Sequence, residues 1–204
     1  MSARVIRNQQ GASAVEFAIV LPLLLIFLFG IIDGGRLLWD LNRLQKATQY
    51  GARMAVVTDV VEGGLSGTTY VGVNVGGVIL TQGDRIPASA FGEVTCNDTA
   101  CTCTVTPCPT AGTYNDTAFD RIVNRMKLMK ADVDYGNVEV VYRSSGLGFA
   151  GDPNGMDLSP LVTVRVRADN RLRFRPLTTP WTSFDLPALA TTLTAEDSAG
   201  TASN

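Results

Sequence analysis

The sequence predicts an α+β protein in which a long N-terminal transmembrane and amphipathic helix packs on an antiparallel sheet with one further helix. Two observations support this fold class. Residues 12–32 form an apolar run that holds a single ionisable group, and a helical pattern continues beyond it to residue 58. After that point, short runs rich in Val and Thr flank one amphipathic segment. The 204 residues are 46% hydrophobic, so the part beyond the helix is long enough to form a core.

The apolar run is long enough to cross a membrane. At a rise of about 1.5 Å per residue, residues 12–32 extend over the roughly 30 Å of a hydrocarbon core. Glu16 is the only ionisable residue in this run. A carboxylate in such surroundings costs several kcal/mol unless it is paired, so Glu16 is a candidate functional residue.

The residues around this run form a recognisable set. They comprise a short basic leader that ends at Gly11, Glu16 followed by Phe17, the run Leu21-Pro22-Leu23-Leu24, the pair Gly35-Arg36 and the later Tyr50-Gly51-Ala52-Arg53. With these motifs, the segment from Arg4 to Thr58 resembles the TadE-like pseudopilins. These are minor pilin-like proteins of the tight-adherence (Tad/Flp) branch of type IV pilus systems.

The resemblance implies a pilin-like fold and a structural role, with no enzymatic activity. A prepilin peptidase would cut after Gly11 on the cytoplasmic side and leave a new amine on Ala12, while the apolar helix stays in the protein. Glu16, next to Phe17, would then pair with the N-terminal amine of a neighbouring subunit. The implied partners are other minor pilin-like subunits, the major pilin, the inner-membrane pilus assembly platform and membrane lipid. The implied role is to start or cap pilus assembly.

Three readings of the N-terminus remain open at this point. Besides the pilin-type helix, the segment could be an uncleaved anchor or a removed secretory signal. A secretory signal has a shorter apolar region with a small-residue cleavage site, and no Ala-x-Ala site stands between Ile32 and Trp39. We therefore favour a leader at 1–11, a helix at 12–58 with its span at 12–32, an exported head at 59–196 and a flexible tail at 197–204.

Charge alone does not fix the orientation of the span. Arg4 and Arg7 precede it, whereas Arg36, Arg43, Lys46 and Arg53 follow it, so counting Lys and Arg favours the reverse topology. A short N-terminal tail is nevertheless easily retained, and long domains translocate largely regardless of charge. We expect a single-pass protein of the bacterial cytoplasmic membrane with a cytoplasmic N-terminus and an exported C-terminal head. The extracellular pilus is a further expected location.

Four cysteines lie close together in the pattern C-x4-C-x-C-x4-C, at Cys96, Cys101, Cys103 and Cys108. Four thiols allow three pairings, and the spacing does not choose among them. We favour the pairs Cys96–Cys101 and Cys103–Cys108, because each closes a short loop that holds turn-forming residues. A zinc site would instead favour C-x2-C spacing and a reducing compartment, so disulfides suit an exported head better.

The head is expected to contain strands and one helix. Alternation of apolar residues predicts strands at 69–80 (with a break at Gly76-Gly77), 91–96, 101–106, 137–143 and 161–168. An apolar face predicts a helix at 117–130, with Thr117 and Asp120 resembling a capping box. The alternation at 161–168 fits an antiparallel sheet with one solvated face.

Several function classes fit the sequence poorly. The chain has no His, which removes the commonest general base and the Ser-His and Cys-His pairs. The formal net charge of −2 gives no footprint for nucleic acid. The loop 152–157 has alternating oxygen ligands, but a Pro-Asn-Gly turn explains it as well as calcium does. We expect neither a cofactor nor a metal. The main alternative to an assembly subunit is an adhesin or binding module at the filament tip.

Overall fold

The computed structural model describes residues 9–109, 112–153 and 155–195, with side chains from residue 14 onward. The chain divides into two compact units. The stalk consists of the residues up to Asp40 together with Arg173–Phe184, and the head consists of Leu41–Leu172 and the chain from Asp185 onward.

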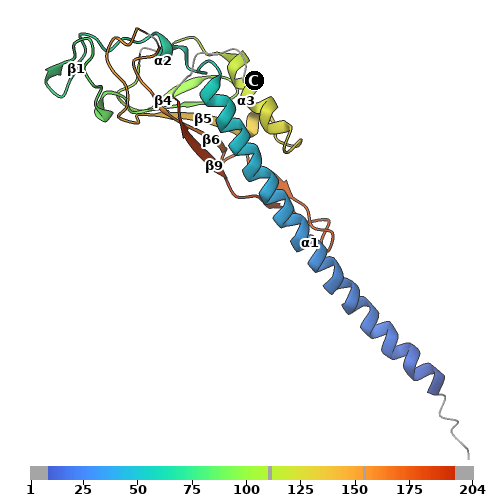
Figure 1. The fold of residues 1–204 in the computed structure, drawn as a ribbon. Helices are drawn as coiled ribbons and strands as arrows, with labels where there is room; N and C mark the ends of the chain where they lie inside the picture. Colours follow the sequence, from blue (N-terminus) through green and yellow to red (C-terminus); the bar gives the residue numbers. More distant parts are fainter. Residues whose placement is uncertain (1–8, 110–111, 154, 196–204) are drawn as a thin grey trace, which may run out of the picture. The chain divides into compact units, whose positions relative to one another are not determined.

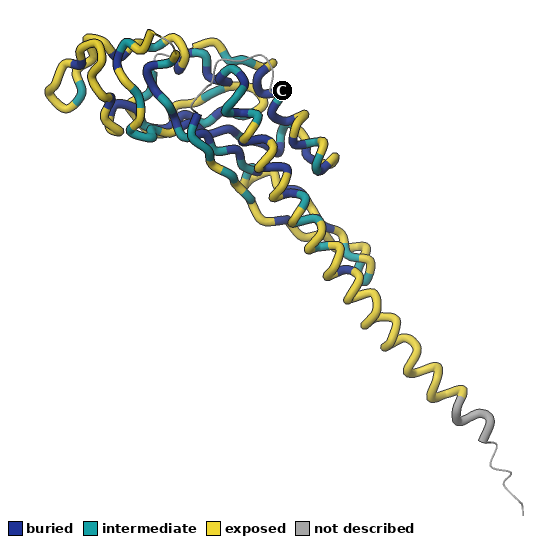
Figure 2. Tube along the Cα trace, in the orientation of Figure 1, coloured by how far each residue is buried: buried dark blue, intermediate teal, exposed yellow. Residues whose placement is uncertain are grey.

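Helix α1 extends over Gln9–Val57 and contributes to both units (Figure 1). It contains Pro22, and the residues on both sides of this proline remain helical. Figure 2 shows that its stalk portion is exposed along most of its length, whereas the portion in the head alternates between buried and exposed residues. The helix predicted at 12–58 is thus present as a single element.

Within the head, α1 buries one stripe of small and apolar residues: Leu44, Ala47, Thr48, Gly51, Ala52 and Ala55. The hydroxyl of Thr48 lies 2.9 Å from that of Thr191 on strand β9 (Ala190–Thr194). A Cβ atom built on Gly51 would lie 2.7 Å from Cγ of Met126 and 3.1 Å from a methyl group of Val164. The small residues therefore allow α1 to approach its neighbours closely.

The main sheet of the head has five strands in the order β4-β3-β5-β6-β9, and every neighbouring pair is antiparallel. The strands besides β9 are β3 (Glu93–Cys96), β4 (Cys101–Val105), β5 (Val138–Arg143) and β6 (Leu161–Val166). Each falls inside a predicted strand. Sequence reasoning missed β9, which pairs with β6 at one edge.

The two faces of the sheet differ in chemistry. The pairs Val138–Val166, Val140–Val164 and Tyr142–Val162 are buried on the face that α1 and α3 cover. The other face carries two ion pairs, Glu93–Arg143 and Glu139–Arg165. The sheet thus has one apolar face and one partly solvated face, in agreement with the predicted alternation.

Helix α3 extends over Asp116–Lys127 and buries Phe119, Ile122, Val123 and Met126. The predicted capping box at Thr117 and Asp120 is wrong, because Asn115 caps the helix instead. Its side-chain oxygen accepts a hydrogen bond of 3.0 Å from the backbone N–H of Ala118. Asn at this position satisfies an N–H that the first turn leaves without a partner.

Shorter elements complete the head. These are α2 (Gly63–Gly67), β1 (Asn74–Val75), β2 (Val78–Ile79), and two 3₁₀ turns at Ala88–Ala90 and Tyr135–Asn137. The strand predicted at 69–80 is in fact the small β1–β2 hairpin. Gly76 and Gly77 form its turn with φ values of 61° and 89°, which glycine adopts at little cost. The long helix, the five-stranded antiparallel sheet and the further helix confirm the predicted α+β class.

Candidate assembly and membrane site

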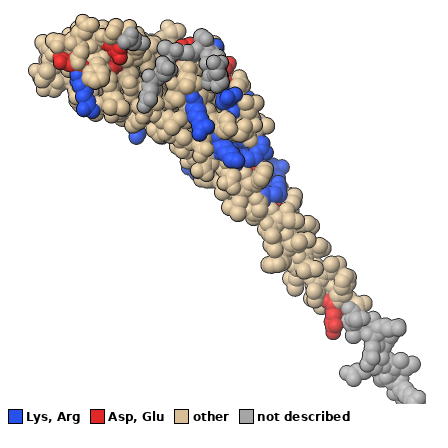
Figure 3. Space-filling view, viewed as in Figure 1, with Lys and Arg blue, Asp and Glu red and all other residues tan. Residues whose placement is uncertain are grey.

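The stalk portion of α1 presents a continuous apolar surface. Every residue from Ala14 to Ile32 is exposed, and large side chains such as Phe17, Leu23 and Phe27 are each more than 60% exposed. Figure 3 shows this part of the helix as uncharged apart from acidic atoms near its N-terminal end. Burying one such side chain is worth about 1.5–3 kcal/mol, so a surface of this size favours a membrane or other helices over water. By length and composition, α1 is the one helix in the described chain that can cross a membrane.

Glu16 and Phe17 lie on this exposed surface. Phe17 is 65% exposed, and Glu16 forms no ion pair with any residue that the structure describes. Gly11 and Ala12 belong to the first turns of α1, which begins at Gln9. The arrangement leaves the Glu16 carboxylate available to a group from another molecule.

The glycines of the stalk make no contact that would require a small residue. A Cβ atom built on Gly30, Gly34 or Gly35 would have no heavy atom within 4 Å outside the helix itself. Glycine costs about 0.5–1 kcal/mol relative to alanine inside a helix. Packing within the described chain therefore does not explain these glycines, in contrast to Gly51 in the head.

Asp33, the first residue after the predicted span, holds a loop of the stalk against α1. Its Oδ1 accepts a hydrogen bond of 2.8 Å from the backbone N–H of Leu177, and its Oδ2 accepts bonds of 2.9 and 3.0 Å from the N–H and hydroxyl of Thr178. Arg36 donates to Oδ1 over 3.1 Å. Asp33 is 8% exposed as a result.

These contacts correct one expectation from the sequence. The spacing of Asp33 and Arg36 predicts an ion pair on a solvated face, and the pair exists, but the carboxylate is covered by Leu177 and Thr178. Burial alone would raise the pKa of Asp33, whereas the hydrogen bonds from Leu177, Thr178 and Arg36 outweigh it and hold that pKa below its ordinary value. Asp33 is thus a structural anchor for the loop.

The loop is also held by aromatic contacts. The guanidinium of Arg36 lies 5.3 Å from the centre of the Phe174 ring, and the rings of Phe174 and Phe184 are 5.2 Å apart. Phe174 belongs to β7 (Arg173–Phe174), which pairs with β8 (Phe184–Asp185). Residues 173–184 thus form a closed loop, here called the stalk loop.

The cysteines of the head form two local disulfides, Cys96–Cys101 and Cys103–Cys108. Cys96 and Cys101 are opposite each other at the end of the β3–β4 hairpin. The turn between them is organised by Asn97, whose side-chain oxygen accepts hydrogen bonds from Thr99 and Ala100. These bridges fix one hairpin and the chain that follows it.

The loop 152–157 is organised by Asp157. Its Oδ2 accepts a hydrogen bond of 2.7 Å from the backbone N–H of Tyr70, and its Oδ1 accepts one from Asp152. Asn154 lies outside the described residues. Among the described residues, no group of three or more His, Cys, Asp or Glu side chains is arranged to hold a metal ion.

The head also exposes an apolar hairpin. Val78 and Ile79 on β2 are 62% and 61% exposed, and Phe149 is 54% exposed. Val78 and Ile79 directly follow the Gly76-Gly77 turn, so this hairpin is a candidate binding surface.

The model of the TadE-like protein family matches residues 11–53, which lie entirely within α1. The match confirms the resemblance of the N-terminal segment and includes Gly11, Ala12, Glu16 and Phe17. The sheet of the head lies outside it. No curated protein and no solved structure matches the chain.

Proposed function

We propose that the protein is a membrane-anchored minor pilin-like subunit that helps to start or cap a tight-adherence type IV pilus. The observation that carries this proposal is the exposed apolar α1 segment, in which Glu16 stands alone within residues matched by the TadE-like family model. Such a helix can reside in the bilayer before assembly and pack on other pilin helices afterwards. No catalytic arrangement is needed for this role.

In the proposed pathway, a prepilin peptidase cuts between Gly11 and Ala12, and the amine released on Ala12 becomes the counter-charge for Glu16 of a neighbouring subunit. The pair would be buried among apolar helices, where opposite charges stabilise one another if both are present. The partners are other minor pilin-like subunits, the major pilin and the assembly platform of the inner membrane.

The stalk glycines support helix packing in the assembly. Gly30 and Gly34 are four residues apart, so they lie on the same side of α1. Small residues at this spacing allow membrane helices to approach closely. Because contacts with the described residues require neither glycine, intermolecular packing supplies a reason for them.

Substitution of Glu16 tests this proposal. Glu16→Val should leave the subunit in the membrane, because it removes an expensive group from the apolar surface. It should nevertheless block assembly, since the amine of the partner then lacks its counter-charge at a cost of about 3–5 kcal/mol. We expect loss of pili and loss of co-purification with the other pilin subunits, measured by electron microscopy and affinity isolation.

Glu16→Asp is the matched control, because it retains the charge and should keep part of the assembly activity. Normal piliation and normal partner binding by Glu16→Val would contradict the proposal and favour a simple anchor.

The second candidate, an adhesin or binding module at the filament tip, is favoured by the exposed β1–β2 hairpin. Replacing Val78 and Ile79 by Ser should then reduce attachment of cells to surfaces while filaments still form. Loss of filaments in a strain that lacks the whole protein would instead support the assembly role.

A further inference from the structure

The stalk loop exposes an unusual amount of apolar surface. Trp181 is 81% exposed, Leu177 is 51% exposed and Phe184 is 44% exposed. Trp combines a large apolar ring with one N–H donor, and this residue is enriched where an apolar phase meets water. Water alone is therefore a poor environment for this loop.

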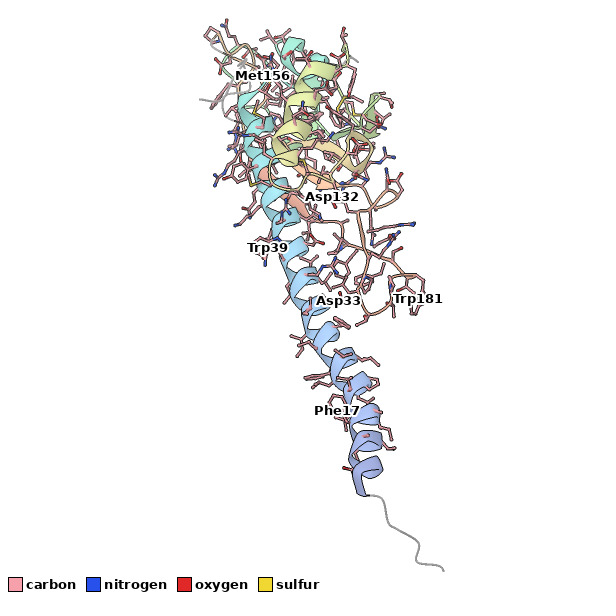
Figure 4. All side chains as sticks on the ribbon, turned by 90° about the vertical axis from the view of Figure 1, so that its right-hand side faces the viewer. Phe17, Asp33, Trp39, Asp132, Met156 and Trp181 are labelled. Carbon is pink, nitrogen blue, oxygen red and sulfur yellow. A yellow bond between two sulfur atoms is a disulfide. The ribbon has the colours of Figure 1, made fainter. Side chains whose placement is uncertain are left out.

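The position of the loop along α1 is fixed. Asp33 binds the backbone of Leu177 and Thr178, so the loop is attached one residue beyond the predicted end of the span. Figure 4 shows Trp181 at about the level of Asp33, with its side chain directed away from α1. The tip of the loop thus lies beside the predicted end of the span.

The dimensions of a bilayer place this point in the headgroup layer. A hydrocarbon core of about 30 Å is flanked by headgroup regions that bring the total to about 40–45 Å, so each headgroup layer is about 5–8 Å thick. With residues 12–32 in the core, Asp33 and Trp181 fall at the start of this layer. Trp39 lies seven residues after Ile32, or about 10 Å further along α1, and is 67% exposed. Both tryptophans of the chain belong to the stalk, but Trp39 lies beyond the headgroup layer, whereas Trp181 lies at its start.

The basic residues of the stalk also favour a position in the headgroup layer. Arg175 is exposed within the loop, and Arg36 keeps 45% of its side chain exposed although it binds Asp33. Basic residues beside a membrane are attracted to anionic phospholipid headgroups. Asp33, the acid that holds the loop, already accepts hydrogen bonds from Leu177, Thr178 and Arg36.

We propose that the stalk loop is a second membrane contact, which inserts Trp181 and Leu177 into the phospholipid headgroup layer of the membrane that α1 spans and places Arg175 near lipid phosphates. The loop would set the depth and rotation of α1 before assembly. This proposal rests on the membrane anchoring included in the proposed function, so the test separates the two.

The test uses the full chain in vesicles of phosphatidylcholine and phosphatidylglycerol that carry bromine, a fluorescence quencher, at defined depths of the acyl chains. In the Trp39→Phe variant, Trp181 is the only tryptophan. We expect it to be quenched more strongly by shallow bromines than by deep ones, and to be at least about twofold less accessible to aqueous iodide than in detergent. The Trp181→Phe variant, which retains Trp39, is the matched control and should be quenched less.

The span is monitored separately by Leu23→Trp in a chain that lacks both native tryptophans. Leu23 lies near the middle of residues 12–32 and should be quenched most by deep bromines. If Leu23→Trp is quenched while Trp181 remains accessible to iodide, the loop proposal is wrong and the span stands. If neither is quenched, the anchoring fails and the loop proposal fails with it.

Two further variants test whether Asp33 holds the loop in place and whether the loop contacts lipid. Asp33→Ala should release the loop and lower the quenching of Trp181 at least about twofold, with that of Leu23→Trp unchanged. Arg175→Gln should weaken the dependence on phosphatidylglycerol. Protection of Trp181 from iodide without quenching by any bromolipid, together with cross-linking to a second copy, would assign the surface to a protein partner and overturn the proposal.

Discussion

Gly51 lies where α1 approaches two other elements of the head too closely for a larger side chain. The atoms that a Cβ would meet belong to Met126 on α3 and Val164 on β6, which are themselves buried. Any larger side chain must push one of these elements outward, because protein interiors are closely packed. The size of the residue at position 51 therefore limits how closely α1 can pack against α3 and β6.

We predict that Gly51→Leu destabilises the head by about 1–3 kcal/mol or more, as overpacking of a filled core usually does. Unfolding of the detergent-solubilised full chain in urea, followed by circular dichroism, measures the loss. Gly67→Leu is the matched control, because no heavy atom lies within 4 Å of a Cβ built on Gly67, and it should change stability by less than about 0.5 kcal/mol. Equal effects of the two substitutions would contradict this packing.

Asp33 makes the attachment of the stalk loop depend on pH. Burial raises the pKa of Asp33, but the hydrogen bonds that hold the loop outweigh burial and keep this pKa below its ordinary value of 3.8. The carboxylate therefore favours attachment above about pH 4, and this contribution is lost as the pH falls through the lowered pKa. We predict that the amides of Leu177 and Thr178 exchange slowly with deuterium at pH 7 and lose protection below pH 4, in addition to the intrinsic effect of pH on exchange.

The matched variants are Asp33→Asn and Asp33→Ala. Asp33→Asn retains one acceptor oxygen, so the amides of Leu177 and Thr178 should keep partial protection that does not depend on pH. In Asp33→Ala, both amides should exchange at least about tenfold faster than in the unmodified chain. Protection that persists in Asp33→Ala would show that the loop is held mainly by the contacts of Phe174.

At the scale of elements, the features that could be predicted were those that depend on a local pattern of neighbouring residues. The alternation in β6 and the apolar face of α3 are local patterns, and both elements were predicted within a few residues. Strand β9, Ala190–Thr194, was missed because Leu193 is its only large apolar residue. The segment therefore shows no alternation of apolar side chains, and its identity as a strand depends on pairing with β6. The role of Asp33 was missed for a similar reason, since Thr178 lies 145 residues further along the chain.

The two disulfides act on one hairpin. Each closes a loop with a sequence separation of 5, for which loop closure predicts about 2 kcal/mol of stabilisation. Cys96 is fully buried, whereas Cys103 is exposed. We predict that replacing Cys96 and Cys101 by Ala costs more stability than replacing Cys103 and Cys108, because only the first change also removes buried apolar contacts.

The exported protein should contain no free thiol, so alkylation without reduction should label none of the four cysteines. Peptide mapping should find bridges only within residues 96–108. Four free thiols with stoichiometric zinc would contradict both the disulfides and the expected export of the head.

At the scale of the whole molecule, sequence and structure contribute different information. The residues around Gly11 and Glu16 are close together in the sequence, so this motif could be identified without the structure. The family match is confined to part of α1. The sheet of the head lies outside this match, and the exposure of Val78 and Ile79 on the hairpin became visible only in the structure. The stalk loop likewise could not be predicted, because it forms only where the chain after Leu172 returns to α1. No local pattern in the sequence indicates that contact.

Cleavage between Gly11 and Ala12 would determine the N-terminus of the mature protein. Because Gly11 precedes the apolar run, cleavage there should remove the basic leader and keep the helix, so the mature chain should begin at Ala12 and remain in the membrane fraction after alkaline extraction. N-terminal sequencing and intact mass measure this outcome. Gly11→Leu should block the cut, whereas Gly34→Leu, a matched change beyond the span, should not. A mature chain that begins at Met1 would indicate an uncleaved anchor, and one that begins beyond Ile32 would indicate a removed signal. The first result would leave Glu16 without the free Ala12 amine of a partner, and the second would remove Glu16 together with Ala12, so either would contradict the proposed assembly.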